Sequence, residues 1–100
     1  MARRYQLLYL VIAKDANDAQ AGYRRRQARP VHIKALTNVV QEGRVKLAGA
    51  ILDEAGAATG SALLVEAASE AEVRELLECD VYSRDRVWER FEIYPFKQAF

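Results

Sequence analysis

The sequence predicts an α+β domain of the ferredoxin-like class, in which an antiparallel sheet carries both helices on one face. The chain has 100 residues, which is enough for one hydrophobic core and too few for two. Hydrophobic residues make up 51% of it and charged residues 29%, with five glycines and two prolines, a composition typical of a compact globular fold. Strand and helix patterns follow one another in the order β-α-β-β-α-β. We therefore expect residues 1–100 to form a single domain of this class.

The first predicted strand covers Tyr5 to Ala13, which is dense in aromatic and β-branched residues and ends at a turn-prone segment, residues 14–18. Both alternating faces of this strand are apolar, which is typical of a sheet covered on both sides. Two short helices cover one face only, so the simplest cover for the other is a second copy of the chain. The sequence therefore predicts a homodimer with sheet packed against sheet. The two faces consist of Tyr5, Leu7, Tyr9 and Val11 on one side and Leu8, Leu10 and Ile12 on the other.

A helix is predicted from Pro30 to Glu42, because proline suits the first turn of a helix and Gly43 supplies a terminating residue. The preceding stretch, residues 20–29, is compatible with a helical segment kinked at the proline. The expected apolar side of the helix has the spacing of one helical face and consists of Ile33, Leu36 and Val40.

Two strands joined by a short glycine-containing connection are predicted to form a hairpin. The first strand runs from Val45 to Leu52 and ends at a loop from Asp53 to Gly60. The second runs from Ala62 to Ala67, with Gly60 and Ser61 at its mouth.

The last part of the chain is predicted to add one helix and one strand. Ser69 and Glu72 have the spacing of a capping box, which predicts a helix from about Glu70 to Glu78. Val87 to Tyr94 is the last predicted strand and is closed by the pair Pro95-Phe96.

Charge and cysteine content argue against several classes of partner. Fifteen basic and fourteen acidic residues give a net charge of +1, so we expect no nucleic-acid partner. The lone Cys79 cannot form an intrachain disulfide, which indicates a reducing, cytoplasmic setting. One cysteine and one histidine cannot make a zinc site without carboxylates, and we expect no metal. The apolar stretch from Leu7 to Ala13 is shorter than the roughly 20 residues of a membrane helix, so we expect no membrane partner.

His32 is the only histidine and the main candidate for acid-base chemistry. An imidazole has a reference pKa of ~6.5 and exchanges protons near neutral pH. The alternative is a partly buried structural histidine at the edge of an apolar face. Arg29 lies three residues earlier on a neighbouring part of the helix surface, where its planar guanidinium can bind a carboxylate or phenolate. The nearby residues 24–26, all arginines, are interpreted as a solvated helix surface.

Asp80 directly follows the second predicted helix, where the helix dipole disfavours a carboxylate. We therefore expect another group to hold it. Two readings stay open: it caps the following turn, or it reaches His32 and orients the imidazole ring. Ser61 is a candidate hydrogen-bond donor to a substrate, although a serine in a turn is the commoner role. Cys79 is interpreted as a packing residue at a helix end.

Several short stretches, in this order, resemble the YciI-like (YCII-related) family of the dimeric α/β barrel superfamily. The resemblance spans nearly the whole chain, and the ordered set is more specific than any single motif. Two positions depart from it, since many members have proline where this chain has Ala50 and Val81. The stretches are Arg29-Pro30-Val31-His32, Gly43-Arg44, Ala48-Gly49-Ala50, Gly60-Ser61, Asp80-Val81-Tyr82, Val87-Trp88 and Tyr94-Pro95-Phe96-Lys97.

The resemblance implies a dimer of ferredoxin-like subunits with an active site built around a histidine and an aspartate. By position these are His32 and Asp80, and the family's arginine three residues before the histidine corresponds to Arg29. The family's Gly-Ser corresponds to Gly60-Ser61, and Tyr82 of the Asp-Val-Tyr stretch joins the expected substrate-binding residues. The related activities, which use no metal, are lactone isomerisation, ring-modifying lyase reactions and dehydrochlorination of a hydroxylated aromatic.

The first functional hypothesis is therefore a cofactor-independent lyase, isomerase or cyclase that moves a proton on a carbonyl-activated or phenolic small molecule. His32 moves the proton, Asp80 orients the imidazole, and Arg29 binds an anionic group. The alternative is a non-catalytic dimeric module that binds a ligand or a partner protein in the same cleft. A third hypothesis is haem binding or cofactor-free oxygenation at His32. A hydrogen bond from His32 to Asp80, with the other ring nitrogen facing a pocket, favours the enzyme.

Overall fold

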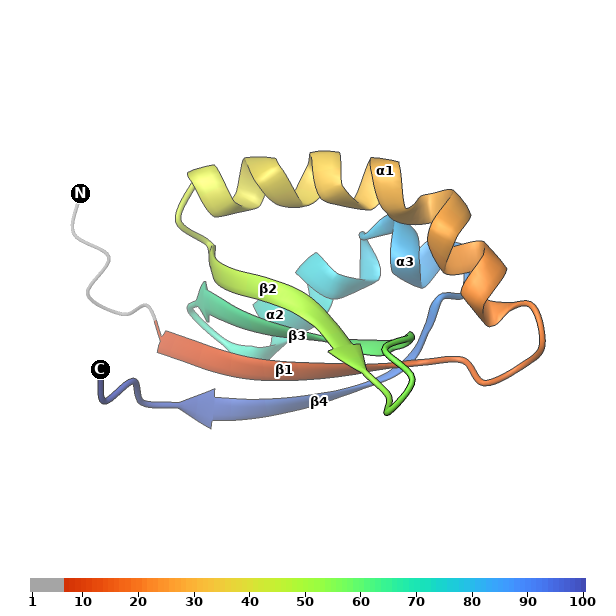
Figure 1. The fold of residues 1–100 in the computed structure, drawn as a ribbon. Helices are drawn as coiled ribbons and strands as arrows, with labels where there is room; N and C mark the ends of the chain where they lie inside the picture. The colour runs from red at the N-terminus through yellow and green to blue at the C-terminus, as the bar shows by residue number, and fades with distance from the viewer. Residues whose placement is uncertain (1–6) are drawn as a thin grey trace.

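A computed structural model describes residues 7–100 and contains four strands and three helices. The strands form one antiparallel sheet in the order β2-β3-β1-β4, which confirms the predicted ferredoxin-like class (Figure 1). Tyr5 of the predicted first strand lies outside the described residues. In chain order the elements are β1 (Leu7–Asp15), α1 (Ala21–Gln41), β2 (Val45–Leu52), β3 (Ala58–Ala67), α2 (Glu70–Glu78), α3 (Val81–Arg84) and β4 (Trp88–Phe96).

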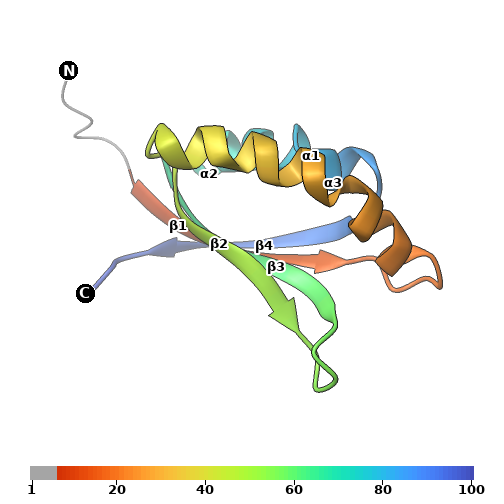
Figure 2. The same ribbon diagram turned by 45° about the horizontal axis from the view of Figure 1, so that its top comes forward.

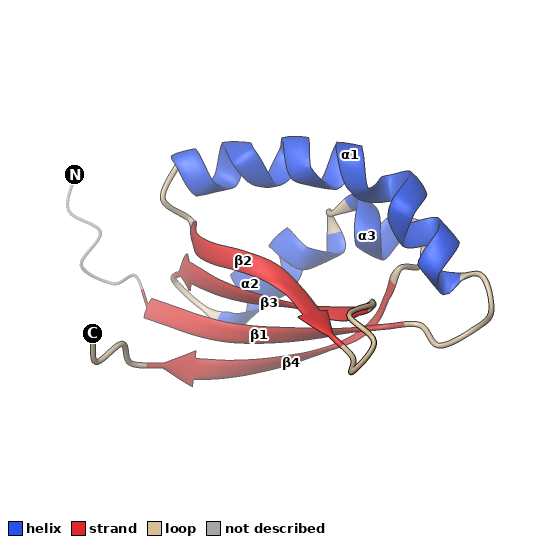
Figure 3. Ribbon diagram, in the orientation of Figure 1, coloured by secondary structure: helices blue, strands red, loops and turns tan. Residues whose placement is uncertain are grey.

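All three helices lie on one face of the sheet, and within residues 7–100 no helix covers the opposite face, called the bare face below (Figures 2 and 3). Alternation along β1 matches this two-layer arrangement, because successive strand residues point to opposite faces. Tyr9, Val11 and Ala13 face the helices and are buried in the core. The residues between them, on the bare face, are half-buried. Residues 7–100 include no helix with both the length and the apolarity that crossing a membrane requires.

Helix α1 is continuous from Ala21 to Gln41 and passes through Pro30. Pro30 is exposed, and so is Arg26, whose backbone carbonyl loses its N–H partner at the proline. The expected apolar side was wrong, because Ile33 and Val40 are exposed. The full length of the helix sets a different buried face, on which small alanines allow close approach to the sheet. Its buried members are Ala21, Ala28 and His32, continued by the half-buried Leu36 and Val39.

The loop of the β2–β3 hairpin is shorter than expected. The Asp53 carboxylate accepts the backbone N–H groups of Ala55 and Ala57, both at 2.9 Å, and Gly56 has a positive φ of 85°. This compact turn lets β3 begin at Ala58, four residues before the predicted start. Gly60 and Ser61 therefore lie inside a strand, and their predicted position at its mouth was wrong.

Gly60 lies where β3 crosses close to β1. A Cβ atom at this position would stand 2.6 Å from the Ala13 carbonyl oxygen. We expect Gly60→Ala to separate the two strands and to cost about 1–3 kcal/mol of stability, because backbone cannot yield as a flexible side chain does. Thermal unfolding checks this, with Gly49→Ala as the matched control because open space surrounds that position. Equal melting temperatures for the two variants would contradict the steric argument.

The segment around Asp80 contains a helix that periodicity did not predict. Helix α2 begins at the expected capping box, where Ser69 Oγ accepts the Glu72 N–H at 3.2 Å. After α2, Asp80 caps the four-residue helix α3 and accepts the Tyr82 N–H at 2.8 Å. Strand β4 then extends through Pro95 to Phe96, beyond its predicted end, because an edge strand tolerates a missing N–H.

Candidate active site

The buried face of α1 places His32 against Asp80 at the start of α3. His32 Nδ1 lies 2.8 Å from Asp80 Oδ1, although the two residues are 48 positions apart. The same oxygen accepts the backbone N–H of Tyr82 at 2.8 Å. Asp80 therefore fills both roles that the sequence left open, since one carboxylate oxygen caps α3 and bonds the imidazole. The carboxylate is fixed by two donors from different elements.

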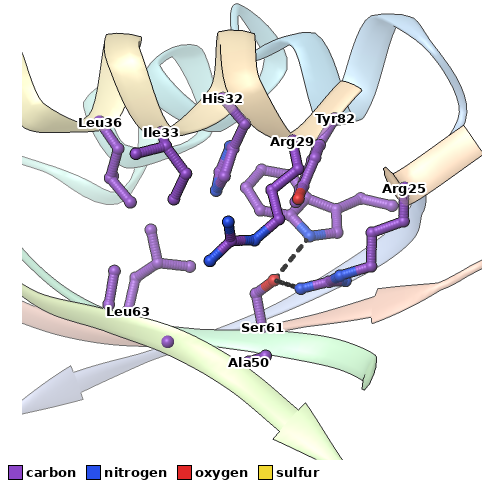
Figure 4. A pocket seen from close by; sticks show the side chains of 12 residues that line it. Arg25, Arg29, His32, Ile33, Leu36, Ala50, Ser61, Leu63 and Tyr82 are labelled. Carbon is purple, nitrogen blue, oxygen red and sulfur yellow. Dashed lines mark hydrogen bonds between the residues drawn. The ribbon is translucent and has the colours of Figure 1, made fainter. Parts of the chain in front are cut away.

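This hydrogen bond determines the tautomer of His32. An ionised carboxylate only accepts, so Nδ1 of the imidazole carries the proton that is shared with Asp80. Nε2 of the neutral ring is then left with its lone pair and can accept a proton. His32 is 6% exposed, and its imidazole lines a cavity between α1 and the sheet (Figure 4).

Two aromatic side chains hold the imidazole ring in place. Tyr82 stacks on His32 with ring centroids 3.7 Å apart and an interplanar angle of 6°. Trp88 meets His32 edge-on, at 5.6 Å and 87°. Burial is the main cause that raises the pKa of the Tyr82 phenol above its ordinary value. His32 is therefore restrained by a hydrogen bond and by ring contacts together.

The cavity beside His32 has a volume of about 140 Å³ and two chemically different sides. Its polar side carries arginine, histidine and serine groups, and its apolar side is formed by α1, β2 and β3 (Figure 4). The polar lining comprises Arg25, Arg29, His32 and Ser61, and the apolar lining includes Ile33, Leu36, Ala48, Ala50 and Leu63.

Arg29 lines the cavity from an exposed position on α1. Within residues 7–100 its guanidinium makes no hydrogen bond or ion pair. A guanidinium with free donors at the edge of a small cavity is suited to bind a carboxylate or phenolate oxygen. The structure thus brings Arg29 to the same cavity as His32, Ser61 and Tyr82.

Arg25 is a site residue that the sequence reading missed. Its side chain is 11% exposed, and its NH1 group contacts both carboxylate oxygens of Asp15, at 2.8 and 2.7 Å. The guanidinium carbon lies 5.0 Å from the centroid of the Tyr82 ring. The interpretation of this arginine as part of a solvated surface was wrong. Arg25 precedes His32 by seven residues, so the helical spacing from the histidine was the signal that placed it on the same face.

The fold and cavity define a ferredoxin-like protein with a part-buried histidine–aspartate pair beside a cavity of about 140 Å³. The YCII-related domain family matches residues 7–97. The chain belongs to this family. It is 31% identical over 100 residues to Protein YciI of Escherichia coli, which covers 94% of this chain and 100% of that protein.

Two other relatives and one solved structure extend the comparison. Fusaric acid biosynthesis protein 2 of Gibberella moniliformis is 31% identical over 97 residues, 89% of this chain and 91% of that protein. Aspartate kinase FUB3 of Fusarium oxysporum is 31% identical over 99 residues, which are 91% of this chain but only 18% of that protein. The solved structure is 5-chloro-2-hydroxyhydroquinone dehydrochlorinase of Burkholderia phenoliruptrix in complex with 2,5-dihydroxybenzoquinone. It has a TM-score of 0.78 and 21% identity, covering 93% of this chain and 96% of that one, and so shares the fold.

Residues 7–100 hold no group of three or more His, Cys, Asp or Glu side chains arranged to bind a metal ion. Cys79 is exposed, beside the C-terminal end of α2. The polar groups that line the cavity are those of the histidine, the serine and the arginines described above.

Proposed function

We propose that this protein is a small-molecule enzyme of the proton-transfer type, a lyase, isomerase or cyclase, with His32 as the general base. One observation carries the proposal. The His32 ring lies 2.8 Å from Asp80 through Nδ1 and also lines a cavity large enough for a small planar molecule. A non-catalytic binding module needs such a cavity but has no need of a carboxylate that fixes the tautomer of a histidine.

In the proposed reaction, His32 Nε2 removes a proton from a carbon or oxygen atom of the substrate. The released electron pair moves onto a carbonyl oxygen, which becomes an enolate or phenolate oxyanion. Asp80 stabilises the imidazolium that forms, and Arg29 and Ser61 bind the oxyanion. The electron pair then returns to take a proton from His32 at another atom, or it expels a leaving group as an anion. The first outcome is an isomerisation and the second a lyase reaction.

The solved dehydrochlorinase suggests which chemistry to test first. Its ligand, 2,5-dihydroxybenzoquinone, is a planar ring that carries carbonyl and hydroxyl oxygens. A ring of this kind has apolar faces for Leu36 and Leu63 and oxygens for Arg29. The phenolic and quinone class is therefore the substrate class that we propose for this cavity.

Activity profiling tests the proposed function. The purified protein is incubated with chlorinated hydroxyhydroquinones, lactones and unsaturated carbonyl compounds, and the products are followed by absorbance and mass spectrometry. We expect turnover in at least one of these classes, and no turnover with His32→Gln. Binding of several compounds with no conversion of any would instead support the ligand-binding module.

We also propose that the functional unit is a homodimer formed through the bare face of the sheet. This face presents Leu47 and Tyr94, which are 57% and 49% exposed, beside the half-buried Leu10. Apolar side chains of β2, β1 and β4 therefore share this face of the sheet. Such a face is suited to pack against the same face of a second copy of the chain. The cytoplasmic location remains a prediction from the sequence.

Sedimentation equilibrium checks the dimer. We expect a mass of twice 11.3 kDa at micromolar concentration, and a shift toward monomer for Leu47→Glu, because a charge would be buried in the interface. Val31→Glu, on the exposed side of α1, is the matched control and should remain dimeric. A wild-type protein that sediments as a monomer would overturn this assembly.

A further inference from the structure

The hydroxyl of Ser61 lies on the polar side of the cavity and accepts hydrogen bonds from two neighbouring side chains. Its side chain lines the cavity, while the residue as a whole is only 4% exposed. Trp88 Nε1 donates to Ser61 Oγ at 3.1 Å, and the NH2 group of Arg25 donates to the same oxygen at 3.1 Å. Both bonds are visible in Figure 4, where they reach the serine from the indole and from the guanidinium.

These two bonds use the full accepting capacity of the hydroxyl. A serine oxygen has two lone pairs and one proton, so two incoming N–H groups leave only the proton for a further hydrogen bond. Neither neighbour can reverse its role, because an indole N–H and a guanidinium are donors only. Ser61 is therefore confined to donating in this arrangement.

Within residues 7–100 no hydrogen bond from the Ser61 hydroxyl to an acceptor is present. The Arg25 NH2 group that donates to Ser61 also donates to the adjacent Gly60 carbonyl, at 3.2 Å. The hydroxyl proton is thus available to a group that enters the cavity. Arg29, at the same cavity, also offers donors only.

We infer that the Ser61 hydroxyl, which can only donate a hydrogen bond, selects ligands that place an acceptor atom against it. Trp88 and Arg25 impose this selectivity because their N–H groups occupy both lone pairs of Ser61. The favoured ligand places a carbonyl or deprotonated phenolic oxygen at Ser61. A ligand that places an N–H group without an accepting lone pair at that point meets a second donor and leaves a buried group unpaired. The inference rests on the proposal that the cavity binds a small molecule, and it assigns Trp88 and Arg25 as positioning residues.

A pair of probes that differ at one atom tests the selectivity. Pentafluorophenol is ionised at neutral pH and presents an oxyanion, whereas pentafluoroaniline has nearly the same shape and presents two N–H donors. Dissociation constants are measured by ¹⁹F NMR titration at equilibrium, without any turnover. We expect the wild-type protein to bind the phenolate at least ~10-fold more tightly than the aniline.

Two variants separate the effect of Ser61 from the charge preference of Arg29. Trp88→Phe removes the indole donor, and Arg25→Lys leaves one ammonium group, which the Asp15 carboxylate should retain. Either change frees a lone pair on Ser61, so the hydroxyl can then accept from the aniline. We expect the phenolate-to-aniline preference to fall several-fold in each variant, and to be unchanged in Tyr23→Phe, which alters an exposed residue on α1.

Circular dichroism establishes which variants fold, and either one suffices for the comparison. An unchanged preference in the folded variants would overturn the inference, and so would equal binding of the two probes, or no binding of either, by the wild type. The outcome is independent of catalysis. A protein that shows this selectivity but moves no proton would overturn the proposed function alone.

Discussion

Replacing His32 by glutamine is expected to lower turnover roughly 100- to 10,000-fold while the fold is retained. The glutamine amide can approximate the hydrogen bond to Asp80, but it does not titrate near neutral pH and cannot carry a proton. Rates are compared with the substrate found by activity profiling, and thermal midpoints are measured on the same samples. A lower turnover with an unchanged thermal midpoint indicates an acid-base residue. A lower thermal midpoint with most of the turnover retained indicates a packing residue.

His32→Ala is the companion variant. It removes the ring that stacks on Tyr82, so it should cost up to a few kcal/mol of stability in addition to the loss of turnover. If His32 is only structural, the alanine variant loses stability and the glutamine variant keeps most of its activity. That second result would eliminate the proposed mechanism and leave the binding module as the better interpretation.

Asp80→Asn is expected to lower turnover by a similar factor, roughly 100- to 10,000-fold, through the tautomer of His32. An asparagine that donates its amide N–H to Nδ1 would move the ring proton to Nε2, which then has no lone pair for the substrate. Some stability should be lost too, about 1 kcal/mol, because Asp80 Oδ1 makes both contacts and an amide NH2 that donates to Nδ1 from this position no longer accepts the Tyr82 N–H.

Asp85→Asn is the matched control, because Asp85 is an exposed carboxylate at the other end of α3. We expect it to retain wild-type turnover. Asp80→Ala should lose both turnover and about 1 kcal/mol of stability, since it removes the cap as well. Asp80→Asn with wild-type turnover would show that the carboxylate caps α3 and does nothing for catalysis.

Elements with strong local signals could be predicted from the sequence. Strand β2 and helix α2 have the predicted bounds, because alternation sets the strand and the Ser69–Glu72 capping box sets the start of the helix. Gly43 ends α1 as expected, with a φ of 81° that glycine adopts without strain. These signals act within a few residues and do not depend on packing.

Features that depend on tertiary contacts could not be predicted in this way. The first half of α1 is stabilised by packing of Ala28 against the core and by the Arg25–Asp15 ion pair, neither of which periodicity records. Helix α3 is too short, at four residues, for a hydrophobic period to appear. The pairing of His32 with Asp80 joins α1 to α3; the residues alone left it as one of two open readings of Asp80, and the resemblance to a family favoured it.

Deuterium exchange tests the role of His32 as a base most directly. Each ring C–H carbon of 2,5-dihydroxybenzoquinone lies between a carbonyl and a hydroxyl carbon. It gains a deuteron when the hydroxyl group ketonises and then loses its original proton to a base, and this exchange in deuterated buffer is followed by ¹H NMR. We predict that the wild-type protein accelerates this exchange at least 100-fold more than His32→Gln does, as expected for a general base. Exchange at the rate of buffer alone, or equal acceleration by the two proteins, would contradict proton transfer by His32.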